Sequence, residues 1–221
     1  MRSFLKYFIT HTYKPLLVRY LSLTRSYTYK GIHLSIPPEV FHPAFFFSSK
    51  LLLKYVGQQT LQKKTFLELG AGSGLISFFA AKRGASVTAT DINPIAIEYL
   101  EKNRKTNDVP IRIIHSDLFN HIPLQSFDII AINPPYYKKQ PKIYSDFAWY
   151  CGENGEYFEN LFKGLAGYMN SGSIVLLILC DGCDMEMIYD MARQQQFRLH
   201  CVQTTRNLLE KNFILKVEQV S

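Results

Sequence analysis

The sequence predicts an α/β domain in which helices cover both faces of a mostly parallel β-sheet. Apolar segments of strand length alternate with helix-like segments through residues 65–195, and this alternation is typical of a parallel sheet buried on both faces. The last two strand-like segments have no helix between them, so we expect the last strand to run antiparallel. The 221 residues, of which 47% are hydrophobic, are enough for one such domain with a modest extension.

The predicted elements follow one another in a regular order. Short apolar segments bounded by turn residues favour strands, and longer periodic ones favour helices. Asn93 followed by Pro94 is a strong helix start, because Asn caps the helix and proline suits its first position. In chain order we expect helical structure broken at Pro15 within 4–21, a hairpin at 27–36 turning near Lys30–Gly31, a helix at 41–56, strands at 65–69, 86–90, 111–114, 127–132, 173–179, 199–204 and 213–217, and helices from residue 74 to 82 and at 93–107, 155–168 and 185–195.

Residues 1–38 are predicted to form a basic extension ahead of a domain at 39–221, with Pro37 and Pro38 at the boundary. The net charge is +7, and six basic residues precede the first acidic residue, Glu39. Such an arm could bind a polyanion, either nucleic acid or a membrane surface, or it could be the solvated face of a helix docked on the domain. We favour docking, because the apolar residues of this segment need somewhere to be buried.

Composition and cysteine usage predict a protein of the reducing cytoplasm. No apolar segment approaches the length of a membrane span, and the first residues lack a signal-peptide cleavage site. The four cysteines show no disulfide framework. Cys180 and Cys183 form one CxxC pair without a second pair or nearby histidines, so we expect no metal site there.

A glycine-rich loop follows the first strand of the predicted sheet. It reads Glu68-Leu69-Gly70-Ala71-Gly72-Ser73-Gly74. Glycine allows a tight turn and a close approach of backbone to ligand, and the next helix offers its positive N-terminus. A nicotinamide-binding loop would have its third glycine at position 75, where this chain has leucine.

Acidic residues follow the next two strands. Asp91 ends the second strand, 23 positions beyond Glu68, where a carboxylate can accept hydrogen bonds from both hydroxyls of a ribose. Ser116, Asp117 and Leu118 follow the third strand. Because the carboxyl ends of parallel strands meet at one edge of a sheet, we expect these residues and the glycine loop to form one ligand site.

The fourth strand ends in Asn133-Pro134-Pro135-Tyr136. Two prolines restrict the backbone and remove two N–H donors, which leaves the Asn133 side-chain oxygen and the Pro134 carbonyl as acceptors. These acceptors suit a planar –NH2 group, because they can hold both hydrogens and turn the nitrogen lone pair towards a reaction partner. Tyr136 can stack on the planar group.

These motifs resemble those of a known enzyme family. The E-x-G-x-G-x-G loop is similar to the first motif of class I S-adenosylmethionine-dependent methyltransferases, and Asn-Pro-Pro-Tyr to that of amino-methyltransferases acting on adenine or guanine amines or glutamine amides. Residues 40–43 and 148–158 resemble segments of the compact release-factor glutamine methyltransferases. The resemblance covers roughly residues 64–218, and it implies a Rossmann-like fold with a seven-stranded sheet and S-adenosyl-L-methionine as cofactor.

The resemblance also implies roles for particular residues. In this family the glycine loop faces the methionine part of the donor, and the acid after the third strand accepts from the adenine amino group. The residues expected to act on the acceptor are Asn133, Pro134 and Tyr136. Those expected to bind the donor are Glu68, Gly70, Ala71, Gly72, Gly74, Asp91, Ile92, Asp117, Leu118 and Asn133.

The favoured function is N-methylation of a glutamine side chain in a protein, with a translation factor as the expected partner. Phe45–Phe47 stand where the family usually has acidic and hydroxyl residues, and Glu156 stands where an arginine is common. A first alternative is therefore an RNA or DNA amino-methyltransferase that binds phosphates through the basic arm. A second is a non-catalytic module that keeps the fold to bind a partner, although the intact donor and acceptor motifs speak against it.

Overall fold

The computed structural model describes residues 21–44, 47–207 and 210–220. The helical structure predicted within residues 4–21 lies outside this part of the chain, apart from Leu21. No helix in the described ranges is long and apolar enough to cross a bilayer. Within the same ranges, no group of three or more His, Cys, Asp and Glu side chains is arranged to hold a metal ion.

Seven strands form the main sheet, close to their predicted positions. They are β3 (Thr65–Leu69), β4 (Ser86–Asp91), β5 (Ile111–His115), β6 (Ile129–Ile132), β7 (Ile174–Cys180), β8 (Phe197–Arg206) and β9 (Lys211–Gln219). Their order across the sheet is β5-β4-β3-β6-β7-β9-β8. The strands from β5 to β7 pair in parallel, and β9 runs antiparallel to both β7 and β8. The predicted antiparallel last strand is confirmed.

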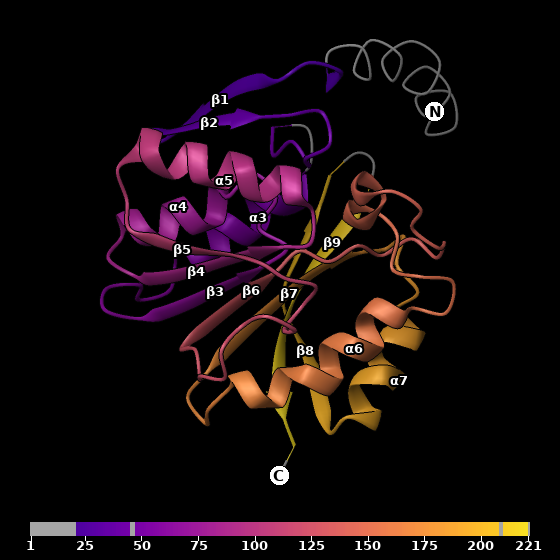
Figure 1. Cartoon of the computed structure of the whole chain (residues 1–221). Helices are drawn as coiled ribbons and strands as arrows, with labels where there is room; N and C mark the ends of the chain where they lie inside the picture. Colours follow the sequence, from indigo (N-terminus) through magenta and orange to yellow (C-terminus); the bar gives the residue numbers. More distant parts are fainter. Residues whose placement is uncertain (1–20, 45–46, 208–209, 221) are drawn as a thin grey trace.

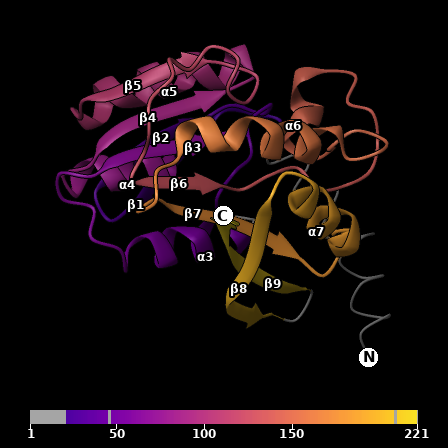
Figure 2. The same cartoon turned by 90° about the horizontal axis from the view of Figure 1, so that it is seen from below.

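Helices cover both faces of this sheet, as predicted. Figures 1 and 2 show α3 (Phe47–Val56), α4 (Leu75–Lys82) and α5 (Pro94–Asn107) over one face, and α6 (Glu156–Leu165) and α7 (Met185–Gln194) over the other. The helix predicted from residue 41 differs at its start, because residues 41–44 are not helical. Pro43 accounts for this, since the residue before a proline disfavours helical backbone.

Successive residues of the central strands face opposite helical layers. In β3, Phe66 packs in the core with α3, α4 and α5, whereas Leu67 packs in the core with α6 and α7. Ile129 and Ile130 of β6 alternate in the same way, and all four side chains are at most 1% exposed. Burial of both faces leaves the carboxyl edge of the parallel strands as the place where loops can bind a ligand.

The predicted N-terminal hairpin is confirmed. Strand β1 (Arg25–Tyr29) pairs antiparallel with β2 (Ile32–Ile36), and the two lie above α5 in Figure 1. Lys30 and Gly31 form the turn between them with positive φ angles of 46° and 74°. A two-residue turn with positive φ at both positions matches the right-handed twist of the strands that it joins.

Two asparagine side chains of α5 hold β2. The Asn107 amide accepts from the His33 backbone N–H at 2.8 Å and donates to the His33 carbonyl at 2.7 Å. Asn103 accepts from the Ser35 N–H at 2.8 Å and donates to the Ser35 carbonyl at 3.1 Å. The hairpin is therefore bonded directly to the sheet domain. The boundary expected between residues 38 and 39 stays a prediction.

Candidate active site

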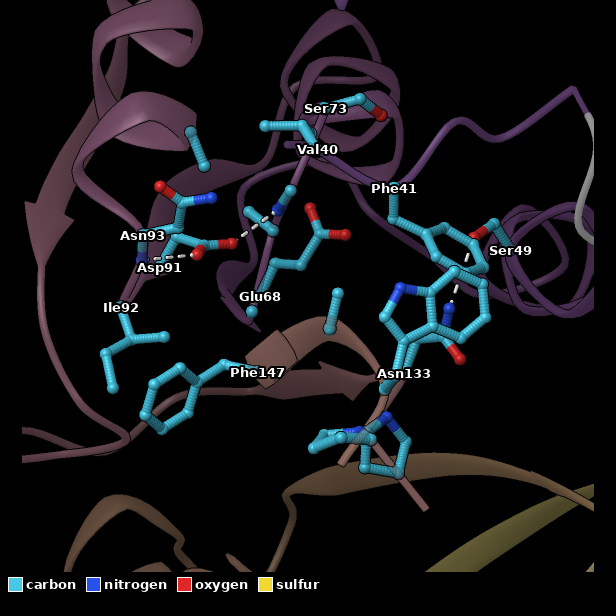
Figure 3. A pocket seen from close by; sticks show the side chains of 18 of the residues that line it. Val40, Phe41, Ser49, Glu68, Ser73, Asp91, Ile92, Asn93, Asn133 and Phe147 are labelled. Atoms are coloured by element: carbon cyan, nitrogen blue, oxygen red, sulfur yellow. Dashed lines mark hydrogen bonds between the residues drawn. The ribbon is translucent and has the colours of Figure 1, made fainter. Parts of the chain in front are cut away.

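A pocket opens at the carboxyl ends of β3, β4, β5 and β6, where the sequence places its motifs (Figure 3). Residues from the glycine loop, the two acidic positions and the Asn-Pro-Pro-Tyr turn all line it. The sequence-predicted residues on its wall are Glu68, Gly70, Ala71, Gly72, Asp91, Ile92, Asp117, Leu118, Asn133, Pro134 and Tyr136.

Gly74 is predicted to bind the donor, but it does not line the pocket. It is the N-cap residue of α4 and has a φ of 80°. A Cβ at this position would lie 2.5 Å from Leu100 Cδ2 and 2.6 Å from Phe78 Cε2. Glycine is needed here because the backbone is left-handed and α5 packs closely against the start of α4.

The Asp91 carboxylate shapes the glycine loop as well as the pocket. Its Oδ2 accepts from the Gly72 N–H at 2.8 Å, and its Oδ1 accepts from the Asn93 N–H at 2.9 Å (Figure 3). The side chain is largely buried, and this burial raises the pKa of its carboxyl. Asp91 thus joins the turn after β4 to the loop after β3, so the part of the pocket between the two strands is preformed.

Glu68 is a second buried acid on the pocket wall, at only 6% exposure. Its Oε2 accepts from the Ser77 backbone N–H at 2.8 Å and also from the Ser77 hydroxyl. Burial outweighs these bonds and raises the pKa of Glu68 to about 8. At neutral pH the Glu68 carboxyl is therefore mostly protonated, and a cationic group bound beside it would favour its ionised form.

Asn133 stands at the end of β6 and is held by a residue that sequence reasoning missed. Its Nδ2 donates to Ser49 Oγ of α3 at 3.2 Å (Figure 3). The two residues are 84 positions apart in the chain. No motif contains Ser49, so the sequence carries no signal for this contact.

The Tyr136 hydroxyl hydrogen-bonds with the Cys180 thiol at the end of β7 and with the Tyr137 hydroxyl. Cys180 Sγ lies 3.9 Å from Cys183 Sγ. The Cys183 thiol, through this contact, lowers the pKa of Cys180 to about 7. Burial raises the pKa of the Tyr136 phenol above its usual range, so the phenol stays protonated. The cysteines are free thiols, as predicted.

Aromatic side chains to which the sequence assigned no role complete the wall. Phe41 comes from the segment before α3, and Phe147 and Trp149 come from a short 3₁₀ helix (Tyr144–Ala148) and the residue after it. The Phe41 and Trp149 ring centroids are 5.2 Å apart. Figure 3 shows Phe41 on the Asn133 side of the pocket and Phe147 on the Ile92 side. The backbone N–H groups of residues 136 and 137 both donate to the Trp149 carbonyl, at 3.2 and 2.9 Å, which ties this segment to the Asn-Pro-Pro-Tyr turn.

The wall therefore has two chemically different ends. The glycine loop and two buried acids suit a ligand with hydroxyl and cationic groups. Asn133 and the aromatic rings suit a planar polar group.

Comparisons with known proteins identify relatives of this chain. A family profile described as the methyltransferase small domain matches residues 34–149. A protein of Methanocaldococcus jannaschii, named for protein N5-glutamine methyltransferase activity, is 38% identical over 155 residues. That alignment covers 67% of this chain and 76% of the relative.

Solved structures share the fold at low sequence identity. The Mtq2–Trm112 complex of E. cuniculi, which methylates the translation termination factor eRF1, matches with a TM-score of 0.63 and 20% identity, covering 82% of this chain and 99% of that one. A 16S rRNA N2 methyltransferase of T. thermophilus, bound to AdoMet and guanosine, matches with a TM-score of 0.61 and 21% identity, covering 87% and 50%. These likenesses confirm the predicted Rossmann-like methyltransferase fold.

Proposed function

Because the chain belongs to the methyltransferase small domain family, we propose that it transfers a methyl group to the side-chain amide nitrogen of a protein glutamine. The methyl donor is S-adenosyl-L-methionine. In the proposal, Glu68, Gly70, Gly72 and Asp91 bind the methionine and ribose parts. The adenine moiety lies against Ile92, Leu118 and Asp117.

The observation that carries the acceptor proposal is the setting of Asn133. Its Nδ2 is used by Ser49, so its Oδ1 is the end of the amide left for a substrate. The next two residues are prolines, which offer carbonyl oxygens and no N–H. An –NH2 group can donate one hydrogen to Oδ1 and the other to the Pro134 carbonyl, while Tyr136 stacks on its plane.

These contacts would lower the barrier of the transfer. An amide nitrogen is a poor nucleophile because its lone pair is delocalised, and hydrogen bonds that favour a pyramidal nitrogen free that pair. The nitrogen then attacks the methyl carbon in line as the carbon–sulfur bond breaks, S-adenosylhomocysteine leaves, and the nitrogen releases one proton to solvent. Residues that bind more strongly as the nitrogen pyramidalises act on the rate rather than on substrate affinity.

A translation factor is the proposed partner. The M. jannaschii relative is named for glutamine methylation, and the E. cuniculi complex methylates a termination factor. The free thiols suit the reducing cytoplasm. A nucleobase amine is the second candidate acceptor, favoured by the aromatic pair Phe41 and Trp149, which lines the same pocket as Asn133. The basic arm that would bind phosphates lies mostly outside the described residues.

The test is transfer of a labelled methyl group from S-adenosyl-L-methionine into protein and RNA fractions. We expect label on a glutamine of a release factor, located by mass spectrometry. Asn133→Ala should lower the rate about 10²–10³-fold while calorimetry shows unchanged donor affinity. Asn170→Ala, at an exposed turn before β7, is the matched control. Label on an adenine or guanine amine would select the second candidate, and full activity of Asn133→Ala would exclude both.

A further inference from the structure

Ser49 is the polar side chain that holds Asn133 from outside the Asn-Pro-Pro-Tyr turn. Its hydroxyl oxygen accepts from Asn133 Nδ2 at 3.2 Å. The side chain is buried, and it lies at the start of α3 beside the pocket. A helix packed on one face of the sheet thereby contacts the reactive end of the central strand β6.

The contact matters because the two ends of an asparagine amide are chemically opposite. The oxygen is an acceptor and the nitrogen carries two donors. With Nδ2 turned to Ser49, Oδ1 is available to an acceptor –NH2 group. An amide rotated by half a turn would aim its own N–H groups at the substrate's N–H groups, and neither pair could bond.

The other groups around Asn133 do not supply this restraint. Pro134 and Pro135 have no N–H that could hold the amide by its oxygen. Within the described part of the chain, the Asn133 side chain makes one hydrogen bond, the one to Ser49. Without the hydroxyl, the amide would lose the bond that holds its nitrogen away from the substrate.

We propose that Ser49 is a positioning residue for methyl transfer: it fixes the rotamer and amide orientation of Asn133 and does not itself touch the reacting atoms. The proposal rests on the proposed function, in which Asn133 Oδ1 binds the –NH2 group. It predicts that the Ser49 hydroxyl contributes to kcat and does so only through Asn133.

The sharpest comparison is between Ser49→Thr and Ser49→Val. These side chains have nearly the same shape and differ in one hydroxyl, so any strain from the added methyl group is shared. We expect Ser49→Thr to keep kcat within about threefold of the unsubstituted protein and Ser49→Val to lower it about tenfold, which corresponds to about 1.4 kcal/mol of activation free energy. Ser49→Ala should resemble Ser49→Val. Donor affinity by calorimetry should stay the same in all three.

A double-substitution cycle tests whether Ser49 acts through Asn133. In an Asn133→Ala background, Ser49→Val should leave the residual rate unchanged, because nothing remains to be oriented. An equal loss in both backgrounds would overturn the proposal, as would equal rates for Ser49→Thr and Ser49→Val. If the residual rate is too low to measure, the Thr–Val ratio decides alone. Melting temperatures show whether the variants fold.

Different results would exclude the proposed function and the positioning role of Ser49. Full activity of Asn133→Ala would exclude the proposed function. A severe loss in Asn133→Ala, with Ser49→Val unaffected, would keep the proposed function and exclude the role of Ser49.

Discussion

Replacing Glu68 by glutamine should make the protein more stable at neutral pH and flatten the pH dependence of its stability. Glutamine has nearly the same shape, and its oxygen can keep both hydrogen bonds from Ser77. It also removes the cost of protonating on folding a carboxyl that is ionised in the unfolded chain and only 6% exposed in the folded one. The pKa of this carboxyl is about 8 in the folded protein, against 4.5 for an exposed glutamate.

The sign follows from where the proton sits. Between these two pKa values the folded state holds the proton and the unfolded state has lost it, so stability is full below about pH 4.5 and falls as the pH rises through about 8. The slope is about 1.4 kcal/mol per pH unit, or about 3 kcal/mol from about pH 5.5 to about pH 7.5. For a chain of this size that is roughly 6–12 °C of melting temperature.

The assay is scanning calorimetry of the two proteins across this range. The wild-type melting temperature should fall relative to Glu68→Gln as the pH rises, and the other titrating groups, Asp91 included, largely cancel in the difference. Parallel curves would refute the reasoning, because they would mean that Glu68 is ionised in the folded protein. Calorimetric titration with donor gives a second readout. If a cationic group of the donor binds beside Glu68, binding near neutral pH should release a proton from wild type and none from the variant.

Four further substitutions give predictions for the hairpin turn, the glycine loop, the donor site and the acceptor end. Gly74→Ala should destabilise the protein by about 2–4 kcal/mol, since it adds a Cβ in contact with α5 at a φ of 80°. Gly31→Ala, at a φ of 74° with nothing within 4 Å, should cost about 1 kcal/mol in the same denaturation assay. Asp91→Ala should weaken donor binding by about 1–3 kcal/mol in calorimetry, and it should also lower the melting temperature because the Gly72 N–H loses its acceptor. Equal donor affinity would contradict the role given to this acid. Tyr136→Phe should keep kcat within about threefold, because the hydroxyl bonds the thiol of Cys180 and the ring remains; a loss near a hundredfold would mean that the hydroxyl also binds substrate.

The elements that the sequence predicts well are those whose causes are local. The start of α5 follows from Asn93, whose side chain accepts from the Ile95 N–H at 2.9 Å, with Pro94 at the first helical position. The parallel strands are apolar because both of their faces are buried. The carboxyl-edge site follows from the fold, since parallel strands end together.

The features that the sequence does not reveal depend on distant parts of the chain. Strand β9 lies between β7 and β8 in the sheet. The order of the strands along the chain does not predict this position, because it does not say which strand edges pair. Ser49 and Phe41 reach the site from segments before the first sheet strand, so no spacing relates them to Asn133. The wall residue Trp149 lies in a segment that carries the family resemblance. Its place beside Phe41 depends on the hydrogen bonds that join its backbone to the Asn-Pro-Pro-Tyr turn.

The asparagine contacts between α5 and β2 are possible because the spacing along the helix nearly equals the spacing along the strand. Four residues of helix rise about 6 Å, and two residues of strand span about 6.6 Å. Asn107 therefore reaches the backbone of His33, and Asn103 that of Ser35. These two strand residues are two positions apart, so their N–H and C=O groups point to the same side. Slipping the hairpin by one residue would break both pairs and turn the buried Leu34 outward. The helix thus acts as a third strand at the free edge of β2, and an edge satisfied in this way cannot recruit a strand from another molecule.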